Sequence, residues 1–433
     1  MNFTELISML SVVFLGIILV SYFNEKVVKL PNEIGFMTIT LIASIVMLAL
    51  EALGVAPIIK LANSMTHIDF HDVILGGYIC YLLFSGSVSI KFKDLTHDRL
   101  LIASLAFIST LIAALIYATL TMVIIRVVGI EMTFIQACIL GSIIAPTDPI
   151  SAMSILKKAG LSERISLVIE GESLFNDGIA VALFVTFSSL NKSSTSGIAT
   201  EFLGTIVWNI FGALFVGFVV SYILFLIFRT TNQKYIEILV SLTAVSMAYS
   251  ISEHLEVSGP TAAVVVGIFF ATYMSSIHDN NEEYYANFYT FWKVIDKILN
   301  GVLYIMIGIA ALFLHNINGF IVIVITAIIM SLFARYISIL GPIWLFSRNR
   351  NMIPQKYSKD VRVKDKRAMA KLLTWGGLKG GICIALALGT RNIFTPEQYD
   401  FVILSTYSIV VFTTLVQGLS IQKLYSRIKT DLC

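Results

Sequence analysis

Polar side chains that can bind a cation stand together in an apolar part of the chain. Residues 171–178 read GESLFNDG. In a helix, Glu172 and Asn176 are four residues apart, as are Ser173 and Asp177, so the side chains form two adjacent columns on one face. A hydroxyl, an amide oxygen and carboxylates grouped in this way favour a hard cation. An interhelical hydrogen-bond network is the structural alternative.

The Asp177 carboxylate can bind a proton as well as a cation. Because one group cannot hold both at once, the two ions would compete for it. In a fold that opens to each side of a membrane in turn, this competition would couple opposite movements of cation and proton.

Two further stretches interrupt apolar segments and each carries a charge. Residues 143–152 read IIAPTDPISA, with Thr147 and Asp148 between two prolines that remove backbone donors and disrupt a helix. Residues 375–381 read WGGLKGG and contain Lys379. A broken helix has two ends of opposite partial charge. Asp148 and Lys379 could therefore neutralise a crossed pair of broken helices.

The charges inside apolar segments need partners, since each costs about 2.5–3.5 kcal/mol at the bilayer centre on insertion scales. Glu172 and Lys379 are an alternative ion pair, and the residues alone do not decide between Glu172 and Asp148 as the partner of Lys379. Arg335 has no carboxylate in its own segment, so we expect it to pair with another helix.

The composition indicates a membrane protein built from helices. Of the 433 residues, 57% are hydrophobic and 13% are charged, whereas soluble domains carry roughly 25% charged residues. The net charge of +3 gives no indication of a nucleic-acid partner. The four cysteines include no CxxC pair, and neither a disulfide framework nor a cofactor is expected.

The apolar segments predict an all-α, multi-pass membrane protein of about 13 transmembrane helices. The predicted spans are residues 6–23, 34–53, 73–90, 100–124, 133–156, 165–188, 204–228, 235–252, 260–275, 294–314, 319–346, 372–390 and 401–422.

The basic residues between these spans predict the orientation. Lys and Arg are divided 23 to 4 between the two sides, with the other 3 of the 30 inside spans. By the positive-inside rule the N-terminus lies outside and the C-terminus in the cytoplasm of a cell-membrane protein. The long basic connection at 347–371 is then cytoplasmic, either as a topogenic loop or as a contact with anionic lipid.

Thirteen spans divide into six, a linker helix at 204–228, and six. The first span of each half starts from the opposite side, so the halves are inverted repeats, as in many secondary transporters. Spans 5 and 12 then correspond, and these are the two interrupted spans. Paired broken segments in corresponding positions point to an ion site near the middle of the membrane.

The stretches APTDP, GESLFNDG and WGGLKGGICIALAL, in this order, resemble the cation:proton antiporter-1 family of sodium–proton exchangers, the NhaP and NHE type. Residues 257–267 and 291–310 agree, and Asn300 falls on an Asn of the family. The resemblance implies an NhaA/NhaP-like fold and a homodimer. It implies a dimerisation part of approximately 1–92 and 234–314 and a transport core of approximately 98–190 and 319–424.

The resemblance also implies roles for individual residues. Asp177 would bind the cation and the proton, with Thr147 and Ser173 as further cation ligands and Asn176 orienting the site. Asp148 would support the helix crossing, and Glu172 would pair with the basic residue of span 12. An Asn–Asp pair implies electroneutral one-for-one exchange in this family.

Two departures from the family pattern bear on the cation. The family commonly has GLRG in span 12, where this chain has GLKG. A Lys379 that gave up its proton could add a second proton to the cycle and make exchange electrogenic. A carboxylate often follows LLF in span 3, where this chain has Ser85.

We therefore expect a secondary antiporter, and not an enzyme, that exchanges Na+ for H+, with Li+ or K+ as alternative cations. A gated channel or uniporter is the competing class, because broken helices also suit a polar path. An intramembrane enzyme would need a motif such as HExxH or GxGD, and Asp177 lies in FNDG instead.

Overall fold

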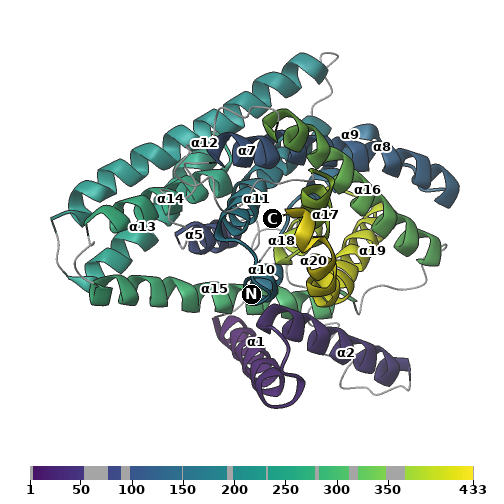
Figure 1. Ribbon diagram of the computed structural model, residues 1–433, viewed down its shortest axis with the longest axis horizontal. Helices are drawn as coiled ribbons and strands as arrows, with labels where there is room; N and C mark the ends of the chain where they lie inside the picture. Colours follow the sequence, from purple (N-terminus) through teal and green to yellow (C-terminus); the bar gives the residue numbers. More distant parts are fainter. Residues whose placement is uncertain are drawn as a thin grey trace.

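The computed structural model describes residues 3–52, 77–88, 98–148, 150–192, 198–230, 233–277, 282–311, 320–347 and 366–432. All regular elements in these ranges are helical, which confirms the all-α prediction (Figure 1). The first half contains α1 (Phe3–Phe23), α2 (Asn32–Ala52), α5 (Ile79–Val88), α7 (Arg99–Ser104), α8 (Thr110–Val128), α9 (Phe134–Ile144), α10 (Ile150–Lys158) and α11 (Glu163–Lys192).

The rest of the chain contains α12 (Ile198–Phe228), α13 (Lys234–His254), α14 (Gly259–Ile277), α15 (Glu282–Ala311), α16 (Phe320–Ser347), α17 (Lys366–Gly376), α18 (Gly381–Leu388), α19 (Pro396–Phe412) and α20 (Gly418–Leu432). Short π-helical turns, η1 (Asn24–Val28), η4 (Leu105–Ser109) and η7 (Thr413–Gln417), join or extend some of these helices.

The described helices fit a chain that crosses a membrane many times. Seven are long and apolar enough to cross, the bent pair α17–α18 makes up to eight, and four shorter apolar helices lie at 34–44, 79–88, 134–144 and 259–274. These helices coincide with predicted spans. The tenth predicted span, 294–314, overlaps α15 up to Ala311, and α15 is not among these helices, so the number 13 stays a prediction.

Both interrupted spans are broken in the structure. The first consists of α9 and α10, with residues 145–148 non-helical between them and Pro149 outside the described residues. The second consists of α17 and α18, whose axes differ by 54° across a break of four residues. The prolines in one break and the glycines in the other explain why neither segment continues as a single helix.

Matching caps fix the starts of two helices beside the breaks. Thr133 caps α9 in a box with Gln136, and Thr395 caps α19 in a box with Gln398. The two glutamines also meet, since Gln136 Nε2 donates to Gln398 Oε1 over 3.3 Å. The start of the first broken span is therefore tied to the last long apolar segment of the chain.

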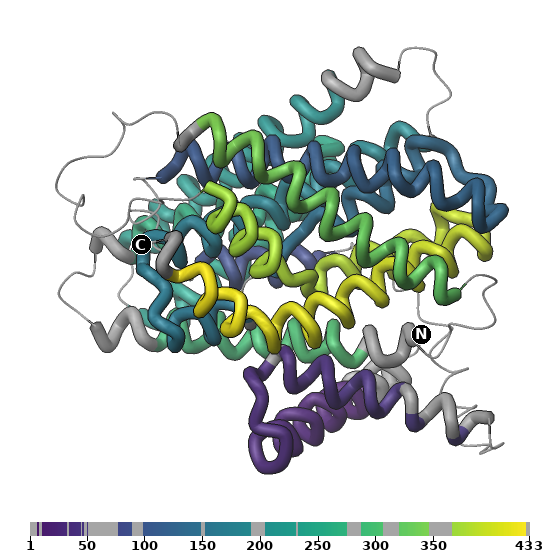
Figure 2. Tube along the Cα trace, turned by 45° about the vertical axis from the view of Figure 1, so that its right-hand side comes forward, coloured from purple at the N-terminus to yellow at the C-terminus, as the bar shows by residue number. Residues whose placement is uncertain are grey.

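The helices form two groups with α11 between them. In Figure 1, α12, α13 and α14 gather on one side of the molecule and α16 to α20 on the other, while α15 runs beneath. Figure 2 shows α1 and α2 as a pair at the lower edge, where both pack against α15. One buried apolar cluster is built from α5 and α12–α15, and a larger one centres on α8, α9, α11, α16, α18 and α19 and also takes in residues of α2, α5, α14 and α15.

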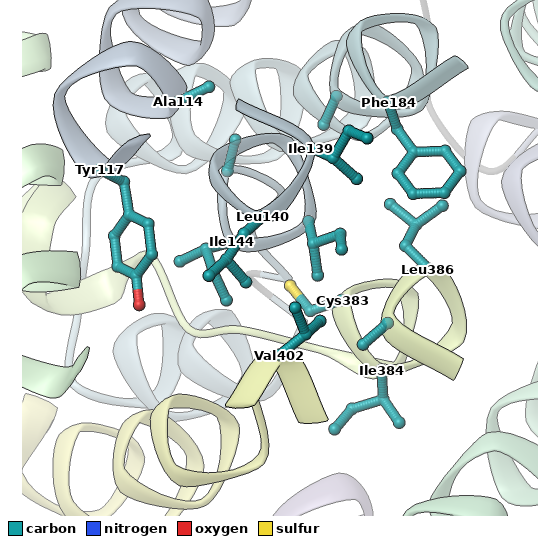
Figure 3. Packing of buried hydrophobic residues seen from close by; sticks show 14 of the residues in the cluster. Ala114, Tyr117, Ile139, Leu140, Ile144, Phe184, Cys383, Ile384, Leu386 and Val402 are labelled. Atoms are coloured by element: carbon teal, nitrogen blue, oxygen red, sulfur yellow. The ribbon is translucent and has the colours of Figure 1, made fainter. Parts of the chain in front are cut away.

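The second of these clusters surrounds the first half of the broken span α9–α10. Figure 3 shows the side chains of α9 in the middle of neighbours from α8, α11, α18 and α19. The labelled residues are Ala114, Tyr117, Ile139, Leu140, Ile144, Phe184, Cys383, Ile384, Leu386 and Val402. Because apolar packing surrounds α9, the half-helix that leads into the polar break is held in place by protein side chains.

The basic connection predicted at 347–371 is represented only by its ends. Residues 348–365 lie outside the described part of the chain, and α17 begins at Lys366. The predicted linker helix at 204–228 lies within α12.

Candidate ion-binding site

The two broken helices are joined backbone to backbone at their breaks. The amide N–H of Asp148 donates to the carbonyl oxygen of Leu378 over 2.8 Å. On the other side of the crossing, the backbone N–H of Lys379 donates to Thr413 Oγ1 over 3.1 Å. Backbone groups that the breaks release from helical hydrogen bonds therefore find partners within the crossing.

Lys379 places its charge at the end of α9. Its Nζ donates to the carbonyl oxygens of Ala145 (3.1 Å) and Pro146 (3.0 Å), directly after the last residue of that helix. These carbonyls carry the negative partial charge of a helix C-terminus. Lys379 therefore lies at the negative end of this half-helix.

Asp148 lies against the second break. An added Cβ atom on Gly380 would be 2.6 Å from the Cβ of Asp148 and 2.8 Å from its Oδ2. A glycine is therefore required here to let the two segments approach. This close approach brings the carboxylate of Asp148 and the ammonium of Lys379 into the same crossing from opposite segments.

The straight helix α11 runs past the crossing and brings its polar face to Thr147. Ser173 Oγ donates to the carbonyl oxygen of Thr147. Asn176 Nδ2 donates to Thr147 Oγ1 over 3.1 Å and to Glu172 Oε1 over 3.0 Å, the latter across one helical turn. The two columns expected from sequence spacing thus meet the first break.

The amide oxygen of Asn176 has an unusual environment. Asn176 is fully buried, and its Oδ1 has no hydrogen-bond partner among the described residues. Buried acceptors are normally satisfied, and leaving one without a donor costs about 1–3 kcal/mol. Such an oxygen at the crossing is suited to bind a cation, or a water molecule from the hydration shell of the cation.

Asp177 lies at the centre of these groups and is half-buried. The backbone N–H of Thr147 is within hydrogen-bonding reach of its carboxylate, and its charged neighbours are Asp148, Glu172 and Lys379. The next residue in α11, Gly178, accepts a hydrogen bond from Thr261 Oγ1 of α14 over 3.0 Å. Asp177 therefore stands where the two groups of helices meet.

The partner expected for Glu172 from the family resemblance was wrong. Glu172 binds Arg335 of α16 through two hydrogen bonds, Nη1 to Oε1 at 2.9 Å and Nη2 to Oε2 at 2.8 Å. Only 1% of Glu172 and 4% of Arg335 is exposed. The ammonium of Lys379 is bound to the end of α9 and is therefore not the group that binds Glu172. The planar guanidinium of Arg335 also fits a carboxylate better than an ammonium does.

Ser85 and Asn300 lie on the other group of helices. Ser85, on α5, is 3.0 Å from Oδ1 of Asp296 on α15, and Asn300 also donates to that carboxylate. They belong to a separate polar group beside the crossing.

Sequence reasoning left two contributors unidentified. Thr413, in η7, caps the released amide of Lys379, and Thr261 links α14 to α11. Thr261 lies within residues 257–267, which resemble the family. That resemblance could have identified Thr261 from the sequence. A single Thr in an apolar helix end, as at 413, gives no such signal, because threonine hydroxyls commonly bond within their own helix.

The groups proposed to bind a cation at the crossing are oxygen atoms, while Cys383 Sγ lies 3.7 Å from the Pro146 carbonyl oxygen. In the part of the chain that is described, no group of three or more His, Cys, Asp and Glu residues could hold a metal ion. A carboxylate, hydroxyls and an amide oxygen at the crossing of two broken helices, beside an unbroken helix, define an ion-coupled secondary transporter.

Comparisons with known proteins identify the family. The family model described as "Sodium/hydrogen exchanger, transmembrane" matches residues 15–427, so the chain belongs to the sodium/hydrogen exchangers. It is 30% identical over 419 residues to the Na(+)/H(+) antiporter NhaP of Pseudomonas aeruginosa, covering 95% of this chain and 94% of that protein. It is 29% identical over 412 residues to NhaH of Halobacillus dabanensis, covering 93% of each.

A solved structure has the same fold. The sodium proton antiporter MjNhaP1 from Methanocaldococcus jannaschii at pH 8 superimposes with a TM-score of 0.73 over 98% of this chain and 99% of that chain. Sequence identity with it is 17%, so this likeness concerns the fold. It confirms the expected NhaP-like architecture.

Proposed function

We propose that the protein exchanges Na+ for H+ across a membrane by alternating access, and that cation and proton compete for Asp177. The observation that carries the proposal is the position of Asp177 beside Thr147 and the unpartnered Asn176 oxygen at the crossing. Membership of the exchanger family supports the same pair of ions.

The hydrogen bonds around Asp177 leave lone pairs for a cation. Ser173 gives its hydroxyl proton to the Thr147 carbonyl, so both lone pairs of Ser173 Oγ remain. Asn176 donates to Thr147 Oγ1, which fixes that hydroxyl as an acceptor on one side. Na+ would bind Asp177, Ser173 and Thr147, with Asn176 orienting the site, and a proton on Asp177 would expel it.

We propose one-for-one, electroneutral exchange. Glu172 is committed to Arg335, and Asp148 packs against the second break, so we assign the exchange of ions to the Asp177 carboxylate. The contacts of Lys379 with two carbonyls favour a permanent role in capping α9 over a role in carrying protons. Electrogenic exchange through Lys379 is the alternative that the transport measurement below addresses.

We further propose that α5 and α12–α15 act as a scaffold against which the helices of the crossing move. The apolar cluster shared by α5 and α12–α15 supports such a scaffold. It joins the expected linker helix at 204–228 to helices of the expected dimerisation part. Pairing of two scaffolds would give a homodimer. The N-terminus is proposed to face outwards, with the basic connection at 347–371 near cytoplasmic anionic lipid.

Proteoliposomes test the function directly. An imposed Na+ gradient should drive protons the other way when electrical leak is clamped, and Asp177→Asn should stop this flux. Na+ movement that persists without proton movement would indicate a channel or uniporter and overturn the proposal. Repeating the assay with Li+ and K+ gives the cation preference.

A further inference from the structure

A carboxylate on the scaffold side of the crossing has no part in the exchange described above. Asp296 is half-buried in α15, a helix of 30 residues. Among the described residues, no Lys, Arg or His forms an ion pair with it. Carboxylates within membrane helices are rare, and they mark ion pathways or pairs by default.

The partners of Asp296 are hydroxyl and amide groups instead of cations. Ser85 Oγ lies 3.0 Å from Asp296 Oδ1, and the Asn300 side chain donates to the same carboxylate from the next turn of α15. These three side chains come from two helices, α5 and α15, and the neighbouring base Lys297 acts on the carboxylate without forming an ion pair with it among the described residues. A hard monovalent cation prefers oxygen groups of this kind.

Ser85 can change its role when a cation arrives. Its Oγ is also 2.7 Å from the carbonyl oxygen of Leu82, one turn earlier in α5. A hydroxyl has one proton and two lone pairs. When that proton turns to Leu82, a lone pair of Ser85 becomes available beside the Asp296 carboxylate.

The polar group is connected to the crossing by one face of α15. Asp296, Asn300 and Leu303 are separated by four and three residues, so they share that face. Leu303 touches the start of α18, since a Cβ added to Gly381 would be 2.5 Å from Leu303 Cδ1. Seven residues of helix are about 10 Å long, which places Asp296 about two turns from the crossing.

We propose that Asp296, with Ser85 and Asn300, forms a second cation-binding station on the scaffold, which holds the transported monovalent cation on its way to or from Asp177. The proposal rests on the proposed sodium–proton exchange. The station sets how readily the site is filled at low Na+ concentration. It leaves stoichiometry unchanged, because no proton is exchanged there.

The opposing interpretation is that Asp296 only ties α5 to α15. Asp296→Asn separates the two, since an amide oxygen can still accept from Ser85 while the charge is removed. A unit charge about 10 Å from the crossing is worth about 1 kcal/mol at intermediate dielectric, or about five-fold in affinity. A purely structural tie predicts that no Na+ binds at Asp296, and the binding measurement below tests this.

The first test is the Na+ dependence of exchange in proteoliposomes at fixed pH. Asp296→Asn should raise the half-saturating Na+ concentration about five-fold and keep the Na+-to-H+ ratio, while Asp296→Glu should stay near wild type. Glu25→Gln, whose side chain is 72% exposed, controls for the loss of an acidic charge. The double variant Ser85→Glu with Asp296→Ser returns a carboxylate to the same place and should restore the Na+ dependence.

The second test is equilibrium binding of radioactive Na+ to purified protein. Asp177→Asn should retain weak, saturable binding, and adding Asp296→Asn should remove it. The proposal is overturned if Asp296→Asn has the half-saturating concentration of wild type, or if Asp177→Asn alone binds no Na+. Exchange retained by Asp177→Asn would instead overturn the proposed function, so the two failures are distinguishable.

Discussion

The guanidinium of Arg335 holds both carboxylate oxygens of Glu172, at 2.9 and 2.8 Å, deep inside the group of helices that carries the crossing. The pair joins α16 to α11 next to the ion site. Arg335 also lies against the second break, since a Cβ on Gly377 would be 3.1 Å from its Nε. One ion pair therefore positions three segments of the site.

Arg335→Leu should destabilise the protein strongly. Removing one partner of a buried ion pair leaves an uncompensated charge and costs about 3–5 kcal/mol. Thermal unfolding in detergent, followed by the amount of monodisperse protein after heating, measures the loss. Arg164→Leu is the matched control, because the Arg164–Asp98 pair is also bidentate but its Arg side chain is 41% exposed, so its loss should cost less. Equal destabilisation by both variants would contradict this expectation.

Asp177→Asn should abolish exchange and leave the fold intact. The amide keeps the shape of the side chain but can neither carry a negative charge for Na+ nor take up the transported proton. Exchange is measured by intravesicular pH, and folding by size-exclusion profile and thermal stability. Measurable sodium–proton exchange in a correctly folded variant would refute the central role of Asp177.

The Na+ dependence of exchange should shift with pH in one direction. Competition for one carboxylate means that more protons displace more Na+, so the half-saturating Na+ concentration should rise as pH falls. At pH values where the site is largely protonated, the rise should approach about ten-fold per pH unit, the limit for one competing proton. A slope near two protons per Na+ would point to a second titrating group and favour Lys379.

Under the proposed one-for-one exchange, both the wild type and Lys379→Arg should be electroneutral. Arg can donate to the carbonyls at the end of α9 and does not give up its proton. Transport rates measured at imposed membrane potentials of both signs decide the matter. If wild type responds to the potential and Lys379→Arg does not, Lys379 carries a proton and the one-for-one proposal is wrong.

Gly380→Ala should impair transport severely. The added methyl group would lie 2.6 Å from the Cβ of Asp148, where neither backbone segment can yield without separating the breaks. Gly204→Ala provides the control, because a Cβ there meets no atom within 4 Å and alanine favours the helix. Normal exchange by Gly380→Ala would show that the crossing tolerates a wider separation.

The sequence was most informative where residue type and chain position agree. The crossing was predicted from two interrupted spans in corresponding positions, which carry side chains of opposite charge. The polar face of span 6 predicted the neighbourhood of Asp177. Partners from distant helices could not be predicted in the same way. Arg335 was recognised as a charge in need of a partner, but spacing along a helix does not tell which distant carboxylate it meets.

Asp296 shows a second reason why some contacts could not be predicted from the sequence. It lies near the predicted start of a span, where a charge is ordinary and attracts no notice. Asp296 becomes a candidate only through its contact with Ser85 on another helix. In the sequence, Ser85 was notable only as a departure from the family pattern in span 3. The number of spans also stays open, because α15 mixes charged and apolar residues over its length.

The joined breaks have a consequence for how the chain is made. The carbonyls of Ala145 and Pro146 receive their donors from Lys379, 234 and 233 residues later in the chain. A ribosome that adds about 5–20 residues per second needs more than ten seconds to supply them. During that time the first break must remain in contact with water, with the insertion machinery or with temporary partners, because lipid cannot satisfy its backbone groups. The membrane insertion of the N-terminal half is therefore completed only when the C-terminal half arrives.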